Sequence, residues 1–146
     1  MIIRYTELPA AARYIRTAVF MEEQGYQNEF DDIDAYAIHF VAFHNSIPVG
    51  TCRLYQTSTS STWRLGRLAV IAVARGKHIG QELLQYAAVY AQSQGATGIT
   101  LSAQIHALSF YKQAGYRATG VKTMDEGHPH ITMHLSLPSV YEKKEF

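Results

Sequence analysis

The strongest constraint on the fold is a β-prone run, a glycine-containing loop and an amphipathic helix that follow one another directly. The run covers residues 63–70 and the loop covers residues 71–78. From Ile79 onward, apolar residues recur at three- and four-residue steps as far as Ala91, and Gly95 then stops the pattern. This order predicts a strand that leads through a tight turn into the N-terminus of a helix.

The loop reads Arg75-Gly76-Lys77-His78-Ile79-Gly80. A helix N-terminus offers unpaired backbone N–H groups and a partial positive charge, so it attracts anions. The two glycines let the backbone approach a phosphate closely, and Arg75 and Lys77 can add charge-assisted contacts. The turn therefore indicates a pyrophosphate ligand. Its spacing fits neither the Walker A loop nor the dinucleotide Gly-x-Gly-x-x-Gly, which disfavours ATP and NAD.

The rest of the chain predicts a mixture of short strands and helices. We expect a loop at 25–34 that could reach over a site, a hairpin turn at 45–48, a connecting loop at 56–62 and a loose tail at 138–146. The expected strands are 2–5, 37–44, 49–55, 99–103, 116–124 and 131–137, and the other expected helices are 9–20 and 106–113.

Length and charge narrow the class of protein. A chain of 146 residues with one cysteine and a formal charge of +1 has the size of one domain and no basic patch for nucleic acid or an anionic membrane. Neither a signal-peptide core nor a run of about 18 apolar residues is present. We expect one domain over residues 1–137, located in the cytoplasm, with Cys52 as a packed small hydrophobe.

Two motifs in this order resemble the GNAT acetyltransferases. Leu68-Ala69-Val70 followed by residues 75–80 is similar to that family's acyl-CoA motif, and residues 107–116 are similar to its second motif, Ala-x-x-Phe/Leu-Tyr-x-x-x-Gly-Phe/Tyr. Segments 16–24 and 125–131 resemble the ElaA-like subgroup, so the resemblance covers about residues 1–137. It implies an α+β, three-layer GNAT fold. The expected sheet is mixed and largely antiparallel, with six or seven strands, about four flanking helices and a splay between the fourth and fifth strands.

The resemblance implies that acetyl-CoA is the acyl donor and that no metal is needed. Backbone groups of Leu68 and Val70 would pair with the pantetheine amides. His78 stands where the family has glycine, which is compatible with the role if the backbone there is helical and the side chain points away. The implied cofactor-binding residues are Leu68, Ala69, Val70, Arg75, Gly76, Lys77, His78, Ile79, Gly80 and Gln104.

Acyl transfer to an amine also needs a group that removes a proton, because an amine with a pKa of about 10.4 is almost fully ionised at pH 7. The candidates for this base are Glu23, His130, Asp32 and His106, with Glu23 preferred and His130 second. Each could equally have a structural role, and His128 and His130 fit an exposed hairpin turn. The resemblance makes Tyr111 the general acid that protonates the leaving thiolate.

The acceptor is the open part of the prediction. We expect a primary amine on a small molecule or peptide, and the acidic residues Glu29, Asp31, Asp32 and Asp34 suit either a cationic amine or a solvated loop. A non-catalytic acyl-CoA sensor is the first alternative. An enzyme like the acyl-homoserine-lactone synthases is the second, and a homodimer is expected only by analogy.

Overall fold

The computed structural model describes residues 1–58 and 61–139. The described chain divides into two compact units, one formed by residues 1–55 and 65–87 and the other by the described residues among 56–64 and from 88 onward. The strands form a seven-stranded sheet in the order β1-β2-β3-β4-β5-β7-β6. Only β4 and β5 pair in parallel among the registered neighbours. The predicted α+β class with a mixed, mainly antiparallel sheet is therefore confirmed, with three α-helices among its described residues.

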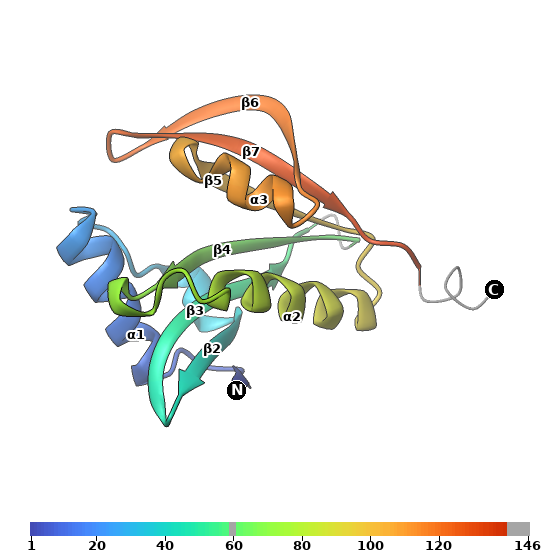
Figure 1. Ribbon diagram of the computed structural model, residues 1–146. Coiled ribbons are helices and arrows are strands. Elements are labelled where there is room, and N and C mark those ends of the chain that lie inside the picture. Colours follow the sequence, from blue (N-terminus) through green and yellow to red (C-terminus); the bar gives the residue numbers. More distant parts are fainter. Residues whose placement is uncertain (59–60, 140–146) are drawn as a thin grey trace. The chain divides into compact units, whose positions relative to one another are not determined.

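In the first unit, β1 (Ile2–Tyr5) pairs with β2 (Ile38–His44), and β2 pairs with β3 (Ile47–Gln56), both antiparallel (Figure 1). The β2–β3 turn consists of Asn45 and Ser46, whose φ angles of 50° and 66° fit the two-residue hairpin turns that match strand twist. The sequence placed Pro48 in this turn, which is wrong. Pro48 lies inside β3 opposite Phe43, next to a register shift that accommodates a residue without an N–H.

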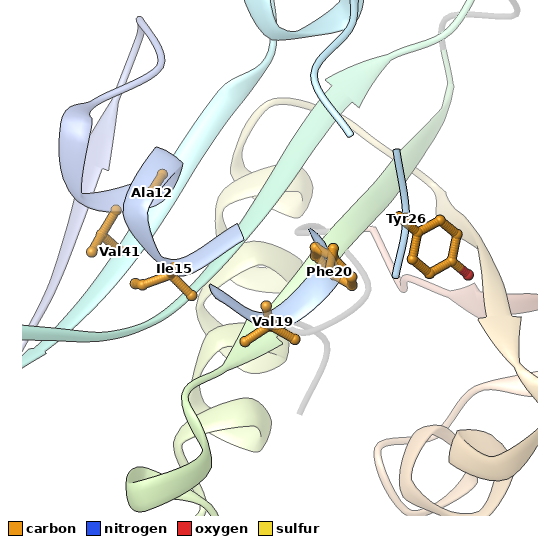
Figure 2. Close-up of a cluster of buried hydrophobic side chains, with 7 residues drawn as sticks. Ala12, Ile15, Val19, Phe20, Tyr26 and Val41 are labelled. Carbon is orange, nitrogen blue, oxygen red and sulfur yellow. The ribbon is translucent and has the colours of Figure 1, made fainter. Parts of the chain in front are cut away.

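The predicted first helix begins as α1 (Ala10–Arg16) and continues as a π-helical segment, η1 (Thr17–Glu23). Its apolar residues at helical spacing, Ala12, Ile15, Val19 and Phe20, are all buried as the pattern predicted. Figure 2 shows them in one cluster with Tyr26 and Val41, to which Ala69 of β4 also belongs. The predicted loop that follows ends in a short 3-10 turn, η2 (Asp32–Ala35).

The second unit contains the start of β4 (Thr62–Val70), whose residues Thr62, Trp63 and Arg64 pair with β5 (Gly98–Gln104). β5 pairs antiparallel with β7 (His128–Ser136), which forms a hairpin with β6 (Arg117–Asp125) (Figure 1). Between β5 and β6 lie a 3-10 turn, η4 (Ile105–Ala107), and α3 (Leu108–Gln113).

The structure corrects the assignment of the last hairpin. Its turn is formed by Glu126 and Gly127, which have φ angles of 48° and 84°, so His128 and His130 belong to β7 and not to an exposed turn. His130 pairs with Gln104 on one side and Thr123 on the other, and it is buried at 7% exposure. Of the expected tail at 138–146, residues 140–146 lie outside the described residues, as do 59 and 60 of the expected connecting loop.

Candidate active site

Two hydrogen bonds fix the peptide group at the C-terminal end of β4. The N–H of Ile71 donates to the carbonyl of Val49 in β3 at 3.0 Å, and the carbonyl of Val70 accepts from Nε of Arg75 at 2.9 Å. Ala69 is buried at 4% exposure beneath this end of the strand. The peptide group between Val70 and Ile71 is thus anchored at both of its polar atoms.

A 3-10 turn, η3 (Ala72–Ala74), then leads into the predicted glycine-containing loop. Gly76 has φ +79° and a Cβ there would meet no described atom within 4 Å, so its conformation and not crowding favours glycine. His78 has φ +64°, in the left-handed region. The condition named for His78, a helical backbone at this position, is therefore not met. A non-glycine residue held there costs about 1 kcal/mol, and such strain gathers at functional sites.

Helix α2 (Ile79–Ser93) starts directly after His78. The N–H of Glu82 donates to the carbonyl of His78 at 3.1 Å, which is the first turn of the helical ladder. The N–H groups of the three residues before Glu82 have no acceptor within the helix, because each helix leaves its first donors unpaired. These donors, together with the glycine turn, form a concentrated set of N–H groups at a helix N-terminus.

A close approach between β3 and α2 fixes the position of this helix end. A Cβ at Gly50 would lie 2.9 Å from Cγ2 of Ile79 and 3.0 Å from Cδ1 of Leu83. A Cβ at this position would force the side chains of Ile79 and Leu83 to shift, so Gly50 sets how closely the start of α2 packs on the sheet. No local sequence signal marks this role, because Gly50 is far from the loop in the chain and lies inside an ordinary β-prone run.

Arg75 and Glu23 form a two-pronged ion pair. Nη1 and Nη2 of Arg75 lie 2.7 Å and 2.6 Å from the two carboxylate oxygens of Glu23. The hydrogen bond from Arg75, together with its charge, outweighs burial and lowers the pKa of Glu23 below its usual value. Glu23, predicted as the first-choice base, is thus held as an ion-paired carboxylate.

The acidic loop residues meet three arginines in a largely buried network. Arg16, which is 1% exposed, binds Glu29 at 2.8 Å and Asp34 at 2.7 Å. Arg53, 4% exposed, donates to Asp34 at 2.9 Å and to Asp31 at 2.6 Å. Buried charges are tolerated when they are paired and hydrogen-bonded in this way.

The two most buried carboxylates in this network have opposite pKa shifts. Burial alone would raise the pKa of Asp34, but the hydrogen bonds and charges of Arg16 and Arg53 outweigh it and lower the pKa to about 2. For Glu29 burial prevails and raises the pKa, although Arg67 and Arg16 counteract it. Arginines already neutralise the charges of Glu29, Asp31 and Asp34. These residues therefore form neither a free surface for a cationic amine nor a solvated loop, the two interpretations that the sequence left open.

Arg67 closes this network from β4. Its Nε lies 2.9 Å from the Glu29 carboxylate, and its Nη2 donates to the Glu29 carbonyl at 3.0 Å. The φ angle of Arg67 is +53°, which is uncommon for a residue in a strand. The side-chain bonds to Glu29 hold this strained residue one position before Leu68.

In the second unit, the structure brings two predicted site residues together. Gln104 of β5 and His130 of β7 are register partners. Nδ1 of His130 lies 2.9 Å from the carbonyl of His128. Because a carbonyl can only accept, Nδ1 carries a proton, and in the neutral ring the lone pair therefore lies on Nε2.

The other predicted site residues are Tyr111 and His106 in this unit and Asp32 in the first unit. Tyr111 of α3 meets Phe110 and Tyr116 edge to face, with ring centroids 5.1 Å and 6.0 Å away. The ring of His134 covers Gly98, where a Cβ would lie 2.6 Å from it. His106 is exposed in η4 and Asp32 is exposed in η2. Within the residues that the structure describes, no three His, Cys, Asp or Glu side chains are grouped as metal ligands would be.

The mixed sheet, with a glycine-containing turn that leads from β4 into α2, has the N-acetyltransferase class of fold. The family model for the acetyltransferase (GNAT) domain matches residues 10–137. The chain therefore belongs to the GNAT family of acetyltransferases, as the two motifs predicted.

Relatives support this assignment over most of the chain. The uncharacterized N-acetyltransferase YjcF of Bacillus subtilis is 32% identical over 125 residues, which are 84% of this chain and 88% of YjcF. A Lactobacillus plantarum protein named as an N-acetyltransferase has a TM-score of 0.86 at 32% identity, covering 94% of this chain and 98% of that one. Escherichia coli ElaA has a TM-score of 0.80 at 25% identity, covering 93% and 100%.

Two more distant structures share the fold alone. An aminoglycoside 6'-N-acetyltransferase complexed with coenzyme A has a TM-score of 0.74 at 17% identity, covering 94% of this chain and 98% of that one. The CoA-dependent acyl-homoserine lactone synthase BjaI has a TM-score of 0.76 at 16% identity, covering 94% and 83%. In the described part of the chain, no helix combines the length and apolar character needed to cross a membrane.

Proposed function

We propose that this protein transfers the acetyl group of acetyl-CoA directly to a primary amine of a small molecule or peptide. The observation that carries the proposal is the turn at residues 75–80. It places a left-handed glycine and a left-handed histidine immediately before the unpaired N–H groups of α2. Such donors suit the pyrophosphate of an acyl-CoA.

Three parts of the first unit would hold the cofactor. The backbone of Leu68 and Val70 would pair with the pantetheine amides, and the first N–H groups of α2 would bind the pyrophosphate. Lys77 is exposed and its ammonium group makes no ion pair among the described residues, so it can add a charge-assisted contact to a phosphate. The solved coenzyme A complex of a protein with this fold supports acyl-CoA as the donor.

In the proposed reaction, the amine nitrogen attacks the thioester carbonyl, a C–N bond forms and the C–S bond breaks. The amine proton passes to a base, and we assign this role to His130, because Nε2 keeps its lone pair while Nδ1 is bonded to a carbonyl. Tyr111 would supply the proton that the CoA thiolate takes up. Both roles are proposals, and Glu23 and Gln104 keep non-catalytic roles in this scheme.

The first test is calorimetric titration of the protein with acetyl-CoA. We expect saturable binding that is lost in the variant Gly80→Trp, which fills the start of α2, and weakened several-fold in Lys77→Glu. Lys122→Glu is the charge-matched control, because Lys122 is exposed in β6. Folded wild type that does not bind acetyl-CoA would refute the proposal. Binding would justify screening amines for release of free CoA thiol.

Two alternatives make different predictions in the same assays. A sensor module would bind acetyl-CoA tightly without releasing thiol with any amine. The fold shared with BjaI, which was solved with SAM and isopentyl-CoA, suggests adding S-adenosylmethionine to the acceptor panel. Thiol release with that acceptor, and not with simple amines, would favour the lactone-synthase type of reaction.

The remaining proposals concern partners and location. We propose a cytoplasmic protein that binds no nucleic acid and no membrane, since its formal charge is +1 without a basic patch. We also propose a homodimer by analogy, which sedimentation velocity would test. The domain is proposed to span residues 1–137.

A further inference from the structure

The end of η1 is tied to the end of β4 through a single arginine. Arg75 donates from Nε to the Val70 carbonyl and from its two terminal nitrogens to the Glu23 carboxylate. Three of its five N–H groups are used in this way, and the other two have no partner within residues 1–58 and 61–139. The guanidinium therefore bridges a carboxylate and a backbone carbonyl.

The two-pronged contact with Glu23 fixes the plane of the guanidinium. Such fork-to-fork pairs restrict orientation as well as adding energy. Because Nε lies in the same plane as the terminal nitrogens, its N–H direction is fixed at the same time. The contacts of Arg75 with Glu23 and with the Val70 carbonyl therefore share one guanidinium plane.

The orientation of that carbonyl has a consequence for the edge of β4. The peptide bond is planar and trans, so the Val70 carbonyl points opposite to the N–H of Ile71. That N–H points to Val49 of β3, so the carbonyl faces the edge of β4 turned away from β3. Under the proposed function, the pantetheine arm binds to the backbone groups along this edge of β4.

The same contacts leave Glu23 poorly suited to accept a substrate proton. Both of its oxygens already accept a hydrogen bond from Arg75. Its charge is compensated, and the hydrogen bond from Arg75 lowers its pKa. A base works best when its pKa lies near the working pH. The geometry is therefore that of a support for Arg75.

We infer that Glu23 is a positioning residue that acts through Arg75 to hold the Val70 carbonyl for binding of the acyl-CoA pantetheine arm. The inference rests on the proposed function. It assigns to Glu23 and Arg75 a joint role in donor binding that is separate from the chemistry of proton removal. It also leaves Lys77, and not Arg75, as the cation that the loop directs to a phosphate.

The test compares Glu23→Gln, Arg75→Gln and the double variant in titrations with acetyl-CoA and in initial-rate assays from pH 6 to 9. Glu22→Gln is the matched control, because Glu22 is the neighbouring exposed carboxylate and makes no ion pair within the described chain. The side chains of Arg75 and Glu23 are 43% and 44% exposed, so these substitutions leave the core untouched. Thermal unfolding of each variant checks this directly.

We expect Glu23→Gln to weaken acetyl-CoA binding about three- to fivefold, the scale of a well-formed exposed ion pair. The shape of the pH profile of kcat should not change, and Glu23→Gln should add nothing in the Arg75→Gln background. The inference is overturned if Glu23→Gln removes the acidic limb of the profile at unchanged KM for acetyl-CoA. It is also overturned if the two substitutions are additive or if Glu22→Gln has an equal effect. Wild type that fails to bind acetyl-CoA would instead refute the proposed function, and the inference with it.

Discussion

Removing the guanidinium of Arg16 should destabilise the protein far more than removing an equivalent group from the same helix. Arg16 is 1% exposed and binds both Glu29 and Asp34. In Arg16→Leu, the Glu29 carboxylate keeps only Arg67 and the Asp34 carboxylate keeps only Arg53 as an arginine partner. Breaking a buried pair by removing one partner costs about 3–5 kcal/mol, because a buried charge loses its compensation.

The matched control is Arg13→Leu. Arg13 lies one turn earlier in α1, and its guanidinium also lies over the ring of Phe30, at 4.5 Å compared with 4.8 Å for Arg16. It is exposed, however, and makes no ion pair within the described residues. We expect its loss to cost less than about 1 kcal/mol, as for most surface substitutions.

Urea unfolding at pH 7, followed by circular dichroism, measures both values. For a chain of this length, about 4 kcal/mol corresponds to a fall in melting temperature of roughly 10 °C. A third variant, Arg16→Leu with Glu29→Leu, should recover at least about 1 kcal/mol relative to additivity, because it removes the abandoned charge as well. The reasoning is refuted if Arg16→Leu costs no more than Arg13→Leu, or if the double variant is strictly additive.

Of three further predictions, two concern the first unit and one concerns the second. Gly50→Val should lower acetyl-CoA affinity at least several-fold in calorimetry and destabilise the protein by about 1–3 kcal/mol in urea unfolding, because its Cβ would lie 3.0 Å from the side chain of Leu83; equal affinity would contradict the role of this contact in placing α2. Tyr111→Phe should lower kcat in the thiol-release assay about three- to tenfold at unchanged KM for acetyl-CoA, since a thiolate leaves tolerably without an acid. Unchanged kcat would exclude the acid role. The folded-state pKa of Asp34 is lowered to about 2, so its contribution to stability is present above pH 4 and lost as the pH falls toward 2. In acid unfolding, Asp34→Asn should therefore flatten the loss of stability between pH 4 and pH 2. An unchanged slope would count against the pairing of Asp34 with arginine.

The sequence predicted the parts of the fold that depend on local pattern. The strand at 63–70, the turn and the helix from Ile79 were recognisable because apolar spacing and glycine punctuation are local signals. The hairpin turn before β7 was misplaced, because Pro129 between two histidines resembles a turn, whereas Glu126 and Gly127 adopt the left-handed conformations that a tight turn needs.

The charged network escaped the sequence analysis because its partners are distant in the chain. Arg16 reaches residues 13 and 18 positions away, and Arg67 reaches Glu29 across 38 positions. One local signal was available. Arg16 lies four residues after Ala12 and next to Ile15, on the face of α1 that the apolar pattern assigns to the core, and a charge on that face requires a buried partner.

The π-helical continuation of α1 also lay beyond the reach of pattern analysis. Val19 and Phe20 are buried in either kind of helix, so their spacing does not distinguish between them. The wider turn is a property of the backbone hydrogen bonds, such as the one from the N–H of Gln24 to the carbonyl of Val19, five residues apart. It is this segment that ends at Glu23 and brings the carboxylate to Arg75.

The anchored acidic loop changes how an acceptor would be recognised. Residues 25–34 were expected to form a loop that could reach over a site, yet three arginines hold the carboxylates of Glu29, Asp31 and Asp34 and the backbone carbonyl of Glu29. A ligand that contacts this loop meets a surface whose ordering entropy has already been lost in folding. Selectivity at such a surface comes from fit to a fixed shape, and a change of preferred ligand would require paired substitutions, one in the loop and one in the arginine beneath it.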